Sequence, residues 1–89
     1  MTMTDLAAAL DMPLSSATRT IDKLIAKGLV ARRRLEEDRR VVQVTFSNLG
    51  KEIHRFVVTG QKRAARSMLQ TLNAEDRETF LRLLAIVAA

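Results

Sequence analysis

The sequence contains no cysteine, and only 3% of its 89 residues are aromatic, all of them phenylalanine. The missing cysteines exclude disulfides, thiol-based redox sensing and cysteine-ligated zinc. The scarcity of aromatic rings argues against a platform on which single-stranded bases stack. No apolar run reaches the roughly 18 residues that a membrane span needs, and no signal peptide is visible. We therefore expect no membrane association and a cytoplasmic location.

The residues give little support for catalysis. His54 is the single histidine, and no Ser/His/Asp set stands at a spacing typical of a nucleophilic site. An interface or partly exposed position is the ordinary interpretation of His54, with ligand binding or pH sensing as the alternative. Glu36, Glu37 and Asp38 are oxygen ligands suited to a hard cation, but the arginines on both sides disfavour a metal. We expect neither an enzyme nor a cofactor nor a metal site.

Positive charge is plentiful and unevenly placed. The net charge is +5 and the pI is about 10.8. Through residue 66 there are 13 basic against 7 acidic residues, whereas residues 67–89 hold 2 against 3. The basic part suits a polyanionic partner, with charge for solubility alone as the alternative. A chain of 89 residues with 47% hydrophobic content predicts one globular domain.

Two short amphipathic segments open the chain. Residues 4–10 predict a helix with Thr4 as its N-cap, and Pro13 ends the pattern. Residues 15–27 predict a second helix, which Ser15 can cap. Its apolar stripe comprises Ala17, Ile21, Leu24 and Ile25. Two such helices around a tight break make a helix-turn-helix, although many helical proteins contain the same corner.

A basic hairpin is predicted directly afterwards. Residues 29–34 and 40–46 have the composition and alternation of strands, and acidic residues occupy the loop between them. A helix-turn-helix followed by such a hairpin is the order of a winged helix-turn-helix. The second helix can enter a major groove, and the hairpin can reach along the backbone toward the neighbouring minor groove.

The rest of the chain predicts two more helices. Ser47 caps a long helix that runs to about residue 72, with Gly60 as its weak point. About 24 helical residues span roughly 36 Å, too far to pack only against the first 46 residues. Asn73 caps the last helix, which is apolar on two sides and so predicts a partner subunit.

The expected architecture is thus mainly α with a small β-hairpin. Residues 1–46 form a winged helix-turn-helix DNA-binding part, and residues 47–89 form a helical dimerisation part of the same domain. The residues expected at the dimer interface are Phe56, Met68, Leu72, Phe80, Leu81, Leu84, Ile86 and Val87.

The sequence resembles the MarR family of bacterial transcription regulators. The resemblance lies in four short runs: Ser15-Ser16-Ala17-Thr18-Arg19, Gly28-Leu29-Val30, Asp38-Arg39-Arg40 and Phe46-Ser47-Asn48-Leu49-Gly50. It implies a homodimer that binds a palindromic double-stranded DNA operator and usually represses nearby genes. A departure is that the family has two helices ahead of the segment that matches Met1. The family's effector cavity is partly built from those helices, so an effector stays unknown.

The resemblance also implies roles for individual residues. Arg40 is the wing arginine that enters the minor groove, and Asp38 is the acid that steadies it. Arg19 is the best candidate for a base contact, because arginine pairs bidentately with guanine. The full expected DNA-binding set is Ser15, Ser16, Thr18, Arg19, Lys23, Arg32, Arg34, Asp38, Arg39 and Arg40. Lys23, Arg32 and Arg34 are expected on phosphates, which carry no sequence information.

A protein-interaction module is the alternative function. In that case the shortened chain pairs with related subunits and binds DNA weakly or not at all. A DNA-binding regulator must lose affinity steeply as salt rises, whereas a pairing module must not.

Overall fold

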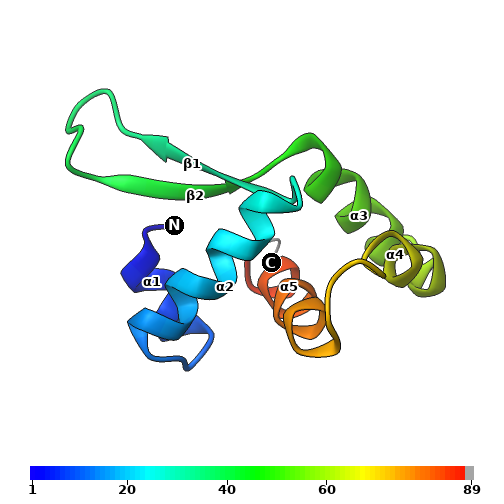
Figure 1. Ribbon diagram of the computed structural model, residues 1–89. Coiled ribbons are helices and arrows are strands. Elements are labelled where there is room, and N and C mark those ends of the chain that lie inside the picture. Colours follow the sequence, from blue (N-terminus) through cyan, green and yellow to red (C-terminus); the bar gives the residue numbers. More distant parts are fainter. Residues whose placement is uncertain (88–89) are drawn as a thin grey trace.

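The computed structural model describes residues 1–87, and the side chain of Val87 lies outside that description. The described residues form five helices and one two-stranded antiparallel hairpin, one helix more than the four that the sequence predicts (Figure 1). Their bounds are α1 Met3–Ala9, α2 Leu14–Ala26, β1 Val30–Arg34, β2 Val42–Phe46, α3 Asn48–Val58, α4 Lys62–Met68 and α5 Ala74–Val87. The predicted fold class, mainly α with a small hairpin, is confirmed. None of the described helices is long and apolar enough to cross a membrane.

The helix-turn-helix forms as predicted, but its caps differ. Thr2 rather than Thr4 caps α1, because the Thr2 hydroxyl accepts from the Asp5 amide at 3.1 Å in a capping box. Ser15 does not cap α2, which starts one residue earlier at Leu14 without any side-chain cap. Pro13 takes the N-cap position with a φ of −59°, so the entry into α2 is set by the proline ring.

The hairpin pairs β1 with β2 in one antiparallel register, from Val30 opposite Phe46 to Arg34 opposite Val42. The N-terminus adds a short third edge, which the sequence did not predict. The Met1 carbonyl accepts from the Val44 amide at 2.7 Å, and Thr2 forms an isolated bridge with Gln43. This contact joins the start of the chain to the hairpin.

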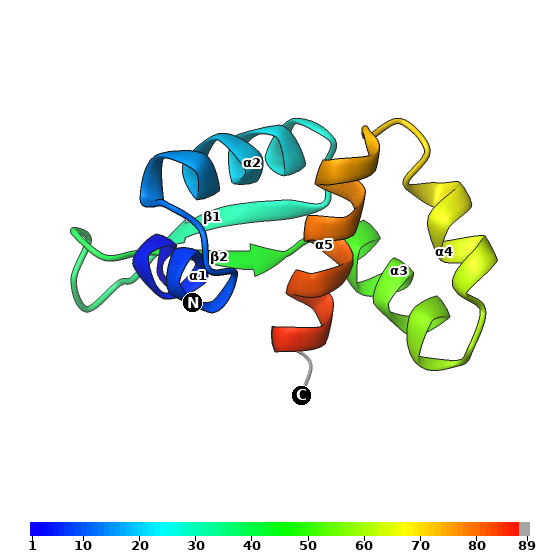
Figure 2. The same cartoon turned by 90° about the horizontal axis from the view of Figure 1, so that it is seen from below.

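The prediction of one long helix after Ser47 was wrong. Ser47 does cap α3, accepting from the Gly50 amide at 3.1 Å, but the helix ends at Val58 and α4 starts at Lys62. Gly60 separates them with a φ of +82°, a left-handed conformation that glycine adopts without a Cβ penalty. The chain therefore turns back at Gly60, and α4 lies beside α3 (Figure 2).

One apolar core joins both ends of the chain. Ile21 and Leu24 of α2 belong to the same cluster as Phe80 and Leu83 of α5. The rings of Phe46 and Phe80 meet edge to face with centroids 5.9 Å apart, a favoured aromatic geometry. Asn73 caps α5 as predicted, accepting from the Asp76 amide at 2.7 Å. The last helix is thus packed on the helix-turn-helix of its own chain.

This packing changes the expected dimer surface. Leu72, Phe80 and Leu84 are buried within the chain itself, so in this arrangement they are not available to a partner. The sequence predicts that α5, which is apolar on two sides, packs on its long neighbour and on a partner subunit; in the structure one of these sides packs on the core of its own chain. Phe56, Leu81 and Ile86 are half-buried and Met68 is exposed. The side chain of Val87 lies outside the described residues.

Candidate nucleic-acid interface

Helix α2 has one face in the core and one face in solvent. Ala17, Ile21 and Leu24 are fully buried beneath it. On the outer side Ser15 and Arg19 are exposed and Ser16 is half-buried. Because residues three, four and seven apart share a helix face, these side chains form one polar surface. The outer face of α2 consists of Ser15, Ser16, Arg19 and Lys23.

Thr18 is turned partly into its own helix. Its hydroxyl donates to the Leu14 carbonyl at 2.8 Å, a back-bond typical of Ser and Thr in helices. The hydroxyl oxygen keeps its acceptor capacity, but its donor is used. Thr18 is therefore less free than Ser15 or Arg19 to read a base.

Lys23, at the far end of the outer face, is held by α5. Its Nζ lies 3.4 Å from Oδ2 of Asp76. The Lys23 side chain is 56% exposed, whereas the Asp76 side chain is only 8% exposed. The predicted phosphate contact thus already has an internal carboxylate as partner.

At the wing tip, Asp38 and Arg40 are joined by two side-chain hydrogen bonds, which we call the fork. The Asp38 carboxylate accepts from Nε of Arg40 at 3.0 Å and from its terminal nitrogen at 3.2 Å. It also accepts from the Arg40 amide at 3.0 Å. These side-chain and backbone hydrogen bonds lower the pKa of Asp38 below its ordinary 3.8. The Arg40 side chain is nonetheless 91% exposed, so its charge is oriented without being hidden.

The other wing arginines divide between two faces of the hairpin. Arg32 forms an ion pair with Asp22 of α2, and Arg34 donates to the Arg39 carbonyl at 2.8 Å. Side chains alternate along a strand, so Arg33 projects from the opposite face. The Arg32–Asp22 pair connects the base of the wing to α2.

A close backbone crossing fixes α2 against the wing. The Ser47 hydroxyl donates to the Gly28 carbonyl at 2.5 Å, and the Ser47 amide donates to the Leu29 carbonyl at 3.1 Å. A Cβ on Gly50 would lie only 2.3 Å from the Leu29 oxygen. Only glycine fits at position 50, and the relative placement of helix and hairpin depends on it.

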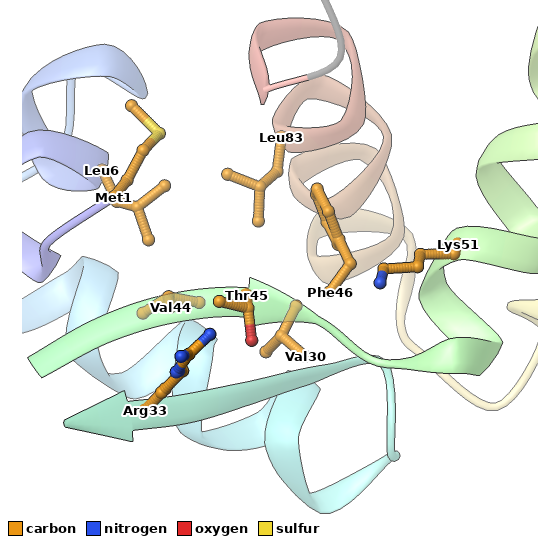
Figure 3. A pocket seen from close by; sticks show the side chains of 9 residues that line it. All are labelled: Met1, Leu6, Val30, Arg33, Val44, Thr45, Phe46, Lys51 and Leu83. Carbon is orange, nitrogen blue, oxygen red and sulfur yellow. The ribbon is translucent and has the colours of Figure 1, made fainter. Parts of the chain in front are cut away.

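A cavity of about 430 Å³ lies between the hairpin, the N-terminus and α5 (Figure 3). Two cations, Arg33 of β1 and Lys51 of α3, stand at its sides, and Thr45 adds a hydroxyl. The apolar lining consists of Met1, Leu6, Val30, Val44, Phe46 and Leu83. The sequence analysis did not foresee this cavity, because its walls come from four distant segments.

Sequence reasoning missed two partners of the predicted cations. Asp22 and Asp76 hold Arg32 and Lys23, and neither had been assigned to the site. Asp22 stands ten residues from Arg32, and only the hairpin brings the two together. Across residues 1–86 no three metal-binding side chains gather into a site, and His54 is half-buried on α3.

Comparison with known sequences shows which proteins the chain is similar to. Residues 1–42 match the sequence model of the MarR family. Two regulators of Bacillus subtilis are similar along nearly the whole chain. The HTH-type transcriptional regulator YdgJ is 31% identical over 81 residues, or 91% of this chain and 49% of YdgJ. The HTH-type transcriptional regulator YwhA is 28% identical over 87 residues, or 98% of this chain and 63% of YwhA.

The chain is similar to members of the MarR family. Solved structures agree with the winged helix fold. Streptococcus pneumoniae FabT in complex with DNA has a TM-score of 0.63 and 25% identity, with 99% of this chain and 62% of FabT covered. A mutant of E. coli MarR complexed with operator DNA has a TM-score of 0.61 and 27% identity, with 100% of this chain and 64% of that chain covered. The chain spans about half to two thirds of the length of these relatives.

Proposed function

We propose that this chain is a MarR-family transcription regulator, not an enzyme, and that it binds double-stranded DNA in the bacterial cytoplasm as a homodimeric repressor. The observation that carries the proposal is the pairing of two features. One is the exposed Ser/Arg face of α2, and the other is the forked Arg40 at the wing tip. The Arg32–Asp22 pair links them, so one duplex can meet both at once.

The outer face of α2 has the chemistry of a major-groove reader. The groove is about wide enough for one helix. Arg19 is exposed and has no ion-pair partner among the described residues, so its guanidinium is available to guanine. Ser15 and Ser16 can donate to or accept from base edges. We assign Arg32 and Arg34 to phosphates along the wing.

The wing tip has the chemistry of a minor-groove probe. A narrow minor groove concentrates negative potential, which attracts an arginine. Asp38 restricts the Arg40 guanidinium through two side-chain hydrogen bonds, so less side-chain entropy remains to be lost on binding. Arg39 is exposed beside it and supplies a further cation for the backbone.

Homodimerisation is proposed through α3 and α4. Val58 is 69% exposed and is joined on these helices by the exposed Leu49 and Met68. Exposed large apolar side chains of this kind can become buried in an interface, and we assign them to the partner subunit. Phe56, Leu81 and Ile86 remain candidates at its margin, whereas the buried Leu72, Phe80 and Leu84 do not. A two-fold dimer should prefer a palindrome with half-sites one helical turn apart.

The cavity between wing and α5 offers a place for an effector. Its apolar floor and its two cations suit a small molecule with an apolar body and an anionic group. A cation-to-alanine change at Arg33 or Lys51 should then abolish any rise in melting temperature that a benzoate-like anion causes. An unchanged rise in both variants would place the anion elsewhere.

The salt dependence of DNA binding tests the main proposal. Duplexes selected from a random library are titrated by fluorescence anisotropy at about 50 to 200 mM salt, where neutralised phosphates release counterions. We expect affinity to fall about 100-fold or more across this range and the selected sites to be palindromic. A flat salt profile together with mixed dimers formed with longer relatives would favour the interaction module instead.

A further inference from the structure

We propose that the first turn of α5 lowers the DNA affinity of the recognition helix α2, an effect that we call the electrostatic brake. Asp76 forms an ion pair with Lys23, and a DNA phosphate must displace this carboxylate. The inference rests on the proposed DNA binding and concerns its regulation. Figure 2 shows the start of α5 beside the end of α2. The contact between Lys23 Nζ and Asp76 Oδ2 measures 3.4 Å.

The carboxylate is fixed rather than mobile. Asp76 is buried, and its amide is held by the Asn73 cap at 2.7 Å. Phe80, one turn later, is fully buried in the core. Farther along the same helix, Arg82 donates to the Leu10 carbonyl at 3.1 Å. These contacts hold α5 on the helix-turn-helix, so the carboxylate partner of Lys23 is fixed in place.

A second carboxylate borders the same surface. A hollow of about 190 Å³ is lined by Ser16, Arg19 and Lys23 of α2 and by Glu75 and Asp76 of α5. The α2 side chains that are expected to contact DNA therefore line the same hollow as the carboxylates of Glu75 and Asp76. An approaching phosphate is repelled by both of them, and this repulsion is strongest at low salt.

The consequence is an exchange of partners at Lys23. A free lysine that binds a phosphate releases a condensed counterion from the DNA and gains affinity. Lys23 must first give up Asp76, and Asp76 is then left buried without its cation, which is costly. Lys23 therefore contributes less to affinity than an unpaired lysine would.

Replacing Asp76 tests the brake. Asp76→Asn keeps the shape of the side chain and removes its charge. We expect DNA affinity to rise about three- to tenfold and the slope of log K against log salt to steepen by about 0.9, the value for one more phosphate contact. Glu78→Gln is the matched control, because it removes the same charge from the same helix, where Glu78 pairs with Arg66 at 2.5 Å.

Two further variants keep the test decisive. In a Lys23→Gln background, Asp76→Asn should give no gain beyond that of Glu78→Gln, because the cation to be released is missing. Glu75→Gln changes an exposed carboxylate of the hollow and should give a smaller gain. It also decides the question if Asp76→Asn lowers the melting temperature too far for binding to be measured.

The outcomes separate the brake from the function. If the unchanged chain binds DNA with a steep salt profile, but Asp76→Asn and Glu75→Gln do not exceed Glu78→Gln, the brake is overturned and the regulator stands. If only the variants bind, both proposals are supported. If neither the unchanged chain nor any variant binds DNA at about 50 mM salt, where phosphate contacts are strongest, both fall.

Discussion

Arg40 in the wing and Lys23 in α2 each stand beside a carboxylate, but the two carboxylates have opposite origins. Asp38 lies two positions before Arg40 in the chain, whereas Asp76 reaches Lys23 only through the tertiary fold. The Arg40 side chain stays 91% exposed beside an accessible acid, while Lys23 is drawn to an acid that is 8% exposed. A local carboxylate thus directs a cation outward, and a distant buried one withdraws it.

The two ion pairs should also differ in whether they contribute to folding stability or to DNA binding. An exposed ion pair contributes little to folding, so the wing pair serves binding almost alone. A buried carboxylate that loses its cation costs much more, so the pair on α2 serves the fold as well. Four measurements can break or sharpen this contrast.

Removing a buried apolar side chain from α2 should have the largest effect, on the free energy of unfolding. Ile21 is fully buried, so Ile21→Ala should lower the free energy of unfolding by about 2–5 kcal/mol through lost burial and a residual cavity. Leu35→Ala in the half-buried wing loop should cost less than about 1 kcal/mol, since less apolar area is uncovered. Urea unfolding measures both. Equal costs would show that the wing is as integral to the fold as α2.

Arg40→Ala comes next and should act on DNA alone. We expect a loss of about 1–3 kcal/mol in binding free energy, the range for one good contact. The free energy of unfolding should stay within about 0.5 kcal/mol, as for most surface changes. Anisotropy titration at fixed salt gives the first quantity, and urea unfolding the second. Arg39→Ala is the neighbouring control, and a loss as large as that of Arg40→Ala would remove the special role of the fork.

Lys23→Ala should show the reverse behaviour. It leaves Asp76 buried without its cation, and we expect about 1 kcal/mol of lost stability, because the exposed lysine lies at the low end of the range for such pairs. The double variant Lys23→Ala/Asp76→Asn should recover most of that loss. Thermal unfolding of the two variants provides the comparison, and a loss that the second change does not repair would assign it to the lysine stem packing on α2.

The smallest effect is the titration of Asp38. Its pKa is lowered by Arg40, so the pair is fully formed above the ordinary value of 3.8 and is lost as the pH falls through the lowered pKa. An NMR titration of the carboxyl carbon should give a midpoint below 3.8, and Arg40→Ala should move it back toward that value. An unshifted midpoint in the unchanged chain would mean that the fork does not persist in solution.

Periodicity and local chemistry made much of the fold predictable. The apolar stripe through Ile21 and Leu24 placed the face of α2 correctly, because helical spacing alone determines which residues share a side. The alternation in residues 42–46 placed β2 in the same way. The Asp38–Arg40 contact was implied by the family resemblance, and it joins two residues of one short loop. These features depend on neighbours in the chain.

The errors came from long-range packing. A glycine in a helix costs only about 1 kcal/mol, so Gly60 alone could not decide between a bend and a break. The Thr59 hydroxyl helps to end α3 by donating to the Arg55 carbonyl at 3.0 Å. The partners Asp22 and Asp76 were invisible because charge spacing along the chain does not reveal which helices will meet. The cavity and the burial of Phe80 were missed for the same reason.

Gly60 has one more consequence. A Cβ at this position would meet no other atom within 4 Å, so the cost of replacing Gly60 lies in its left-handed torsion and not in a clash. If residue 60 became helical, as Gly60→Ala would favour, the two helices would merge into one rod and carry α5 away from α2. The vacated surface would then accept α5 of a second copy, and the contacts now made within one chain would form between two. Gly60 and the non-helical Gln61 after it thus lie where a hinge between a self-contained subunit and a domain-swapped pair would have to be.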